Sequence, residues 1–293
     1  TPLFIVSKQS FTSPLEFFDN SLVPSLPARE DVEIKSEINK IFIILCINII
    51  FIVSFINVNL YFVYLMIKIP LKILINYSPN FTTYRRNKKN IKYLIFHYTG
   101  MNSESKAINR LTDDRSKVSC HYFIKKNGII ILMVPEAHEA WHAGKSNWKK
   151  DKLMNKSSIG IEISNKGHKF GYQSFPEKQI KSVIKLSKYL IKKYKIEKKN
   201  ILGHSDIAVD RKKDPGEKFP WKYLALNKIG FWHQLKEKKL KIHRNKKISK
   251  NGEKEFFTCL LKFGYFLKLK SKSKNKLLIK SFQRHFRQQL ING

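Results

Sequence analysis

Residues 91–100 have the sequence IKYLIFHYTG. Their apolar side chains alternate as far as Thr99 and Gly100, which predicts a buried β-strand that ends at this point. His97 therefore lies at the mouth of a sheet, where its side chain reaches solvent while the strand holds its backbone. A single histidine in such a place is more often a hydrogen-bonded structural residue than a metal ligand, so a second signal is needed.

That signal lies further along the chain, in residues 202–221, LGHSDIAVDRKKDPGEKFPW. His204 follows another short apolar strand, and Asp214 comes ten residues later in a loop that contains glycine and proline. Two histidines and one carboxylate are the protein ligands of a catalytic zinc site, in which a fourth position stays open for water. The sequence therefore predicts a Zn²⁺ site formed by His97, His204 and Asp214.

Zinc-assisted hydrolysis of an amide also needs a proton acceptor and a positive charge for the developing oxyanion. Glu162 alternates with a row of isoleucines in SIGIEIS, residues 158–164, so it lies on the opposite face of that strand and could act as the base. Lys212, two residues before Asp214, could stabilise the oxyanion. From the pattern alone, an exposed strand residue and a solvated lysine remain the alternatives.

The surrounding pattern predicts an α/β fold, in which helices flank a mixed β-sheet that carries the zinc site at its edge. Asn127-Gly128 between two apolar runs is typical of a β-hairpin. The other expected elements are a helix at 102–111, a strand at 158–164, a helix at 175–194 and a short strand at 200–202.

Outside this region the composition changes. Residues 41–67 carry no charge and are longer than the roughly 20 apolar residues that cross a bilayer, so we expect an N-terminal hydrophobic helix that anchors the chain in a membrane. A buried core helix and an uncleaved signal-like segment are the alternatives. The expected organisation is a poorly ordered leader (1–40), the anchor (41–67), a zinc domain (76–235), a basic linker (236–254) and a small helical tail (255–293).

The charge balance is strongly basic. Lysine and arginine number 57 against 22 aspartates and glutamates, a formal net charge of +35, which favours polyanionic partners. The lysines are spread along the whole chain, however, and no helix-turn-helix, zinc-finger or aromatic RNA-binding signature accompanies them. We therefore expect no specific nucleic-acid partner. The three cysteines have no paired spacing, so they predict no disulfide framework.

Six motifs in order resemble one family, the zinc-dependent N-acetylmuramoyl-L-alanine amidases of type 2, or AmpD-like amidases. They are FHYTGM (96–101), SCHYFI (119–124), AWHAG (140–144), SIGIEIS (158–164), GHSDIA (203–208) and RKKDPGEKFPW (211–221). They occur within residues 78–233, more than half of the chain. The resemblance implies hydrolysis of the amide between N-acetylmuramic acid and L-alanine, in peptidoglycan or in muropeptides.

The same resemblance implies a role for each matching residue. It assigns the zinc ligands, makes Glu162 the catalytic acid and base, makes Lys212 the transition-state stabiliser, and places Trp141 and His142 along the substrate groove. A non-catalytic peptidoglycan-binding or sensing protein on the same fold is the alternative. The complete set of ligands, with Glu162 and Lys212, disfavours it.

The tail is similar to the two ends of a helical peptidoglycan-binding domain. The similarity rests on LLKFGYFLKL (260–269) and IKSFQRHFRQQLING (279–293), while the lysine- and serine-rich middle and Gln288 depart from the pattern. The sequence therefore indicates a degenerate copy of such a domain.

Two signals disagree about the side of the membrane. Six lysines and arginines follow the apolar run through Lys89, and three lie close before it, at Arg29, Lys35 and Lys40, which favours a catalytic domain in the cytoplasm. The wall-binding-like tail favours the outside, where intact peptidoglycan lies. We expect a membrane-associated protein of the cell envelope, with the periplasmic side slightly favoured and a cytoplasmic orientation still open.

Overall fold

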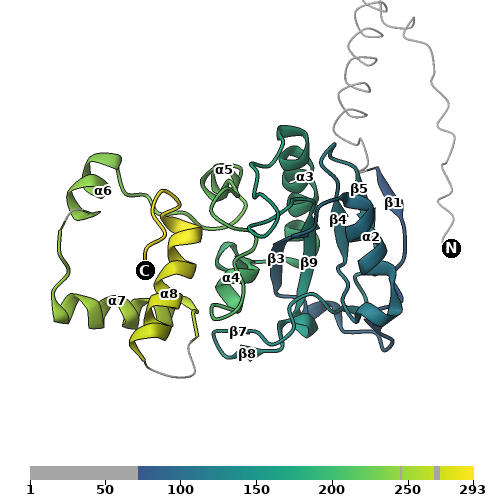
Figure 1. The fold of residues 1–293 in the computed structure, drawn as a ribbon. Coiled ribbons are helices and arrows are strands. Elements are labelled where there is room, and N and C mark those ends of the chain that lie inside the picture. The colour runs from purple at the N-terminus through teal and green to yellow at the C-terminus, as the bar shows by residue number, and fades with distance from the viewer. Residues whose placement is uncertain (1–71, 245, 267–270) are drawn as a thin grey trace, which may run out of the picture. The chain divides into compact units, whose positions relative to one another are not determined.

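The computed structural model describes residues 72–244, 246–266 and 271–293. Its centre is a six-stranded sheet in the order β1-β5-β4-β9-β3-β10 (Figure 1). The strands are β1 (Ile73–Ile75), β3 (Tyr93–Tyr98), β4 (Tyr122–Ile124), β5 (Ile130–Leu132), β9 (Ser158–Ile163) and β10 (Ile201–Gly203). Two short pairs lie beside it: β2 (Phe81–Thr82) with β6 (Glu139–Ala140), and β7 (Asn147–Trp148) with β8 (Asp151–Lys152).

The sheet is mixed. β4, β9, β3 and β10 run parallel, β5 is antiparallel to β4, and β1 is parallel to β5. β4 and β5 form the hairpin expected at Asn127-Gly128, and Gly128 has the positive φ of 89° that its turn requires. The expected α/β fold with a mixed sheet is confirmed.

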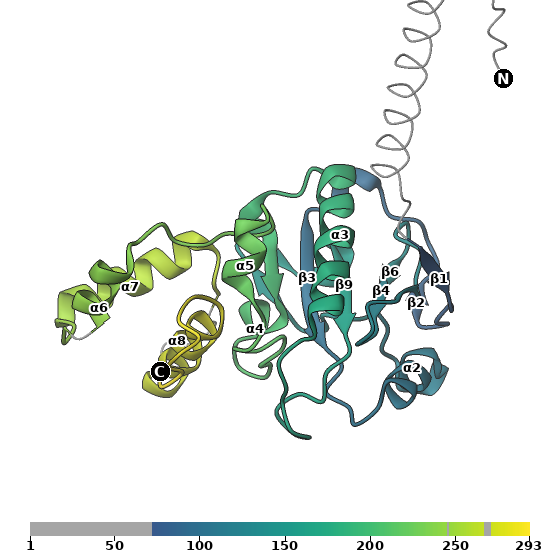
Figure 2. The same cartoon turned by 90° about the horizontal axis from the view of Figure 1, so that it is seen from above.

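Helices cover both faces of the sheet (Figure 2). On one face α3 (Glu177–Tyr194) packs its apolar stripe against Ile159, Ile161 and Ile163 of β9. On the other face α2 (Glu104–Thr112) covers β4 and β5, with Ser103 as its N-cap. The shorter helices are α4 (His204–Ile207) and α5 (Trp221–Leu226), with 3-10 turns at Lys88–Asn90, Asp114–Ser116, Met154–Ser157 and Lys198–Asn200.

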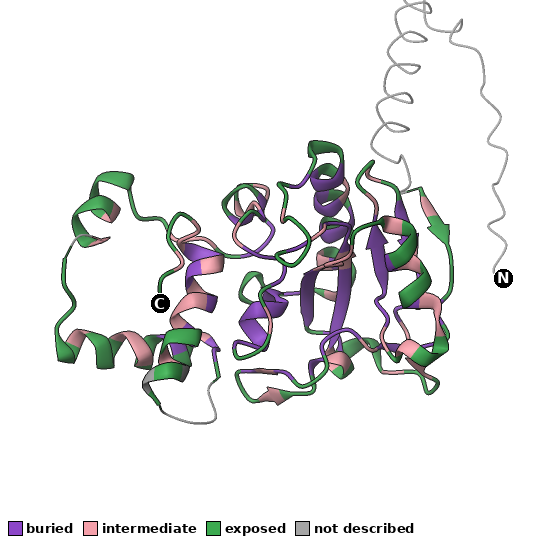
Figure 3. Cartoon of the chain, viewed as in Figure 1, coloured by how far each residue is buried: buried purple, intermediate pink, exposed green. Residues whose placement is uncertain are grey.

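Three further helices follow the sheet and the helices that cover it, which together are called the catalytic fold below: α6 (Glu237–Arg244), α7 (Lys250–Phe263) and α8 (Lys272–Phe286). Residues 236–254, which the sequence presents as a basic linker, thus contain α6 and the start of α7. Ser249 caps α7, because its Oγ accepts a hydrogen bond from the Gly252 amide. α6 buries no residue and stands out as exposed in Figure 3.

Within the described ranges, no helix has both the length and the apolar character that a bilayer crossing requires. The leader at residues 1–40 and the apolar run at residues 41–67 lie outside the described residues.

Candidate metal centre and active site

Three potential ligand atoms converge at the carboxyl ends of β3 and β10. His97 comes near the end of β3, His204 begins α4 directly after β10, and Asp214 lies in the following loop. His97 Nδ1 lies 2.9 Å from His204 Nδ1 and 3.1 Å from Asp214 Oδ2, and His204 Nδ1 lies 3.0 Å from the same oxygen. All three residues are buried, and their arrangement could hold a metal ion.

Hydrogen bonds behind His97 determine which of its nitrogens carries a proton. Ser158 Oγ donates to the Met154 carbonyl at 2.5 Å, so it accepts from His142 Nε2 at 3.1 Å. His142 Nδ1 is then free of a proton and accepts from His97 Nε2 at 3.0 Å. A neutral imidazole has one N–H, so this series of hydrogen bonds leaves His97 Nδ1 with a lone pair that is free to bind a metal.

His204 reaches the same state by a shorter route. Its Nε2 lies 3.1 Å from the Ala143 carbonyl, which can only accept, so the neutral ring carries its proton on Nε2 and its lone pair on Nδ1. Two lone pairs and a carboxylate oxygen therefore face one another with no proton between them, an arrangement that a cation relieves. Tetrahedral ligands ~2.0–2.1 Å from zinc lie roughly 3.3 Å apart, close to the separations found here.

The ionisation states of the ligands suit a metal. Burial, reinforced by the neighbouring His204, lowers the pKa of His97 to about 4, so the ring is neutral at pH 7. Burial acts to raise the pKa of Asp214, but its contacts with His204 and His97 outweigh burial and hold that pKa well below its usual range. A neutral imidazole and an ionised carboxylate are the forms that bind metals.

Glu162 stands beside this cluster, because β3 and β9 pair His97 with Glu162 in register. Its Oε2 is buried and has no hydrogen-bond partner among the described residues. Burial raises the pKa of Glu162 to about 8; Asp214 adds to the shift, and Lys212 opposes it. A cation on the three ligands would act in the same direction as Lys212 and lower the pKa of Glu162. The site thus contains a carboxyl group that can exchange a proton near neutral pH.

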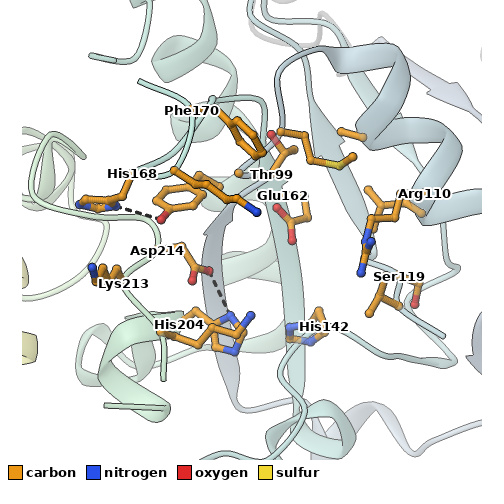
Figure 4. Close-up of a pocket in the computed structure, with 18 of the residues that line it drawn as sticks. Thr99, Arg110, Ser119, His142, Glu162, His168, Phe170, His204, Lys213 and Asp214 are labelled. Carbon is orange, nitrogen blue, oxygen red and sulfur yellow. Dashed lines mark hydrogen bonds and ion pairs between the residues drawn. The ribbon is translucent and has the colours of Figure 1, made fainter. Parts of the chain in front are cut away.

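A pocket of about 760 Å³ opens over the cluster. Figure 4 shows Glu162, Asp214, His142 and His204 directed into it. The wall is rich in cations, and these are Arg110, Lys169, Arg211, Lys212 and Lys213. The pocket can therefore receive an anionic substrate next to the metal ligands.

The structure brings together every residue that the sequence singled out. His97, His204 and Asp214 form the cluster, and Glu162 stands beside it. Lys212, Trp141 and His142 line the pocket. His142 has a second feature that the sequence analysis missed, since Nδ1 of its buried ring accepts a hydrogen bond from His97 Nε2.

The AWHAG and SIGIEIS motifs also contain supporting positions that sequence reasoning passed over. The Ala143 carbonyl orients His204 and the Ser158 hydroxyl orients His142. Gly160 is needed because a Cβ there would lie 2.3 Å from Cγ of His142. The only sequence signal for Gly160 was a glycine inside a strand pattern, which often marks close approach of another group.

Comparison with known proteins supports one family. A family model described as N-acetylmuramoyl-L-alanine amidase matches residues 87–217. Over 216 residues the chain is 35% identical to the N-acetylmuramoyl-L-alanine amidase AmiD of Escherichia coli (strain K12). The aligned region covers 69% of this chain and 77% of AmiD. This chain belongs to the N-acetylmuramoyl-L-alanine amidase family. The resemblance drawn from six motifs, and the enzyme class that it implied, are confirmed.

Two solved structures share the fold of this amidase. One is the complex of E. coli AmiD with anhydro-N-acetylmuramic acid-L-Ala-D-gamma-Glu-L-Lys, at 31% identity and a TM-score of 0.61, covering 72% of this chain and 85% of that one. The other is AmpDh3 from Pseudomonas aeruginosa in complex with anhydromuramic pentapeptide, at 30% identity and the same TM-score, covering 72% and 87%.

Proposed function

We propose that this amidase binds Zn²⁺ through His97, His204 and Asp214 and hydrolyses the amide between N-acetylmuramic acid and L-alanine in peptidoglycan or muropeptides. The observation that carries the proposal is the convergence of two unprotonated Nδ1 atoms and one carboxylate oxygen beside Glu162, whose Oε2 has no hydrogen-bond partner in the part of the chain that the structure describes. That arrangement provides a metal site and a proton acceptor at one end of a pocket.

A zinc ion there would supply a Lewis acid that polarises the amide carbonyl and acidifies water. Glu162 takes one proton from the attacking water and delivers it to the departing nitrogen of alanine, so that water adds across the C–N bond and leaves an acid and an amine. Lys212, on the pocket wall, provides positive charge for the carbonyl oxygen as it becomes negative. His142 and Ser158 hold the proton of His97 on Nε2 throughout.

The pocket wall supports the choice of substrate. Stem peptides carry free carboxylates, and five lysine and arginine side chains face the space in which such a peptide would lie. The two solved relatives hold anhydromuramyl peptides, which are compounds of this class. Trp141 adds an aromatic surface to the same wall, and its Nε1 donates to Thr82 Oγ1 at 3.1 Å.

The test is mass spectrometry of purified muropeptides after incubation with the protein, before and after removal of metal. We expect free stem peptide and the intact muramyl sugar, with activity lost on chelation and restored by zinc. Glu162→Gln is the matched control, because it keeps the three ligands. Binding of muropeptides with no cleavage at any metal content would support the non-catalytic alternative instead.

For location, we propose attachment to the membrane through residues 41–67, with the catalytic fold on the periplasmic side. The uncharged run supports attachment, and the similarity of residues 255–293 to wall-binding domains supports that side. Protease added outside spheroplasts should degrade the catalytic fold. Survival of that fold until the membrane is lysed would contradict the periplasmic side.

A further inference from the structure

The short helix α4, which carries His204, also carries a buried carboxylate that no step of the chemistry uses. Asp206 is 1% exposed. Its Oδ1 accepts from the Tyr265 hydroxyl at 2.6 Å, and its Oδ2 accepts from His285 Nδ1 at 2.8 Å and from the Gly203 amide at 2.8 Å. Two of these three donors belong to the C-terminal tail, so the tail supplies hydrogen bonds to a buried carboxyl group on the helix that begins with a metal ligand.

The tail contacts the main chain of α4 as well. Ser281 Oγ, in α8, donates to the Ser205 carbonyl at 2.5 Å, and Ser281 is fully buried. A one-turn helix cannot satisfy its own carbonyl groups, so this bond supplies a partner that the helix lacks. The His285 ring stacks on Trp221 of α5, with centroids 3.8 Å apart and an interplanar angle of 16°.

Apolar packing joins the same two regions. Tyr265 packs edge-on against Trp148, with the ring centroids 4.9 Å apart. Both belong to a cluster that also contains Ile207 of α4 and Leu260 of α7. Gly264 permits this approach, because it has a φ of 139° and a Cβ there would lie 2.5 Å from the indole of Trp148. Apolar packing thus joins the tail to α4 in addition to the hydrogen bonds of Tyr265, Ser281 and His285.

α4 in turn connects the tail to two metal ligands. His204 is the first residue of the helix, and the amide of Ser205 donates to the Asp214 carbonyl at 2.8 Å. A shift of α4 would therefore move His204 and the backbone of Asp214 together, whereas His97 lies on β3 and would stay in place.

From this connection we infer that Tyr265, His285 and Ser281 of the tail are positioning residues for the metal site, which they act on through Asp206 and α4. The inference rests on the proposed zinc site, and it gives Tyr265, Ser281 and His285 a role in positioning that site, apart from any binding of the wall. Loss of a tail contact should weaken metal binding without touching a ligand.

The experiment compares the zinc dissociation constant of the full chain with those of Tyr265→Phe and His285→Phe, by competition with a chromophoric chelator. Partners of metal ligands typically contribute 10–100-fold to affinity, and these residues act one step further out, so we expect a weakening of about tenfold. Phenylalanine keeps the packing against Trp148 and the stacking on Trp221, so each change removes hydrogen bonding alone.

Tyr93→Phe is the matched control. Tyr93 belongs to the same apolar cluster, and its hydroxyl also donates to a carboxylate, Asp151, at 2.6 Å. Among the described residues that hydroxyl forms no hydrogen bond with α4. We expect Tyr93→Phe to lower the unfolding midpoint as Tyr265→Phe does while keeping the zinc affinity of the wild type.

Equal zinc affinity in all three variants and the wild type would overturn the inference and leave the tail a merely stabilising element. Equal weakening in Tyr93→Phe and the tail variants would overturn it too, because the effect would then follow stability. A wild-type chain that binds no zinc would overturn the proposed metal site together with this inference. Should His285→Phe fail to fold, Tyr265→Phe and Ser281→Ala decide the question, since each removes only a hydroxyl group.

Discussion

The two imidazoles of the metal site are held from different parts of the chain. Behind His97 are side chains of the catalytic fold, His142 and then Ser158. Behind His204 are the Ala143 carbonyl and a one-turn helix that the tail contacts through Asp206. The first set decides which nitrogen of His97 carries the proton. In the second set the Ala143 carbonyl does the same for His204, while α4 and the tail decide where His204 lies. Proton placement and geometry are therefore separate properties of the surroundings, and changes on each side should have different effects.

Removal of a metal ligand should have the largest effect on zinc binding and activity. It removes the ion whichever imidazole is involved, so the surroundings of His97 and of His204 no longer differ in their effect. His97→Ala, His204→Ala and Asp214→Ala should each abolish bound zinc and hydrolysis, because two remaining ligands cannot hold the ion. Metal analysis by mass spectrometry beside the muropeptide assay measures both losses. An active variant that retains stoichiometric zinc would remove that residue from the ligand set.

Glu162→Gln should have the second largest effect, and it leaves the contacts of both His97 and His204 unchanged. Glutamine cannot take the proton of water, so the rate should fall by about 10²–10⁴ while zinc stays bound. Turnover at the wild-type level would exclude Glu162 from the chemistry. Lys212→Ala should also keep the metal and lose rate, which separates residues that act on the substrate from residues that hold the ion.

His142→Phe tests the His97 side alone. Phenylalanine fills the space of the imidazole but cannot accept the proton of His97 Nε2, so zinc affinity should fall about 10–100-fold. His142→Asn restores an acceptor near the position of Nδ1 and should recover part of the affinity. The chelator competition described above measures both variants. If His142→Phe binds zinc as the wild type does, the hydrogen-bonded chain through Ser158 does not control His97.

The last prediction concerns the stability of the folded protein. It depends on Glu162, which is hydrogen-bonded to neither imidazole and so tests a part of the site outside the two sets of contacts. In the metal-free protein its pKa is about 8, above the ordinary 4.5, so between these pH values the folded state holds a proton that the unfolded state has lost. This contribution to stability is present below pH 4.5 and is lost as the pH rises through 8. Glu162→Gln lacks the dependence.

The unfolding midpoint of metal-free Glu162→Gln should therefore rise relative to that of the wild type as the pH increases from 4.5 to 8. A thermal unfolding series across that range measures the difference. A difference that is constant with pH would show that Glu162 does not titrate there. Added zinc should reduce the difference, because the cation lowers the pKa of Glu162.

Local patterns predicted most of the catalytic fold. Alternation identified β3 and β9 and placed Glu162 on the face opposite the isoleucines, and Asn127-Gly128 identified the hairpin. Each of these features depends on neighbours in sequence. The metal ligands followed from residue type after a strand, together with the resemblance of the six motifs.

Features that depend on distant contacts could not be predicted in this way. The bond between His97 and His142 joins residues 45 apart, and the bond between Asp206 and His285 joins residues 79 apart. α6 escaped detection for another reason, since it buries no residue and so has no apolar stripe to recognise.

The position of the tail in the chain has a consequence for the order of synthesis. Residues 265–285 leave the ribosome after every strand of the central sheet, and domains fold as units while translation proceeds from the N-terminus. His97 can then acquire its hydrogen-bonded neighbours while the chain is still growing. Asp206 receives its two tail donors only after α8 has been made. We therefore expect a newly synthesised amidase to pass through a stage in which the sheet is complete but the metal site lacks its tail contacts. Tight zinc binding, and with it amide hydrolysis, should begin only after the tail has folded.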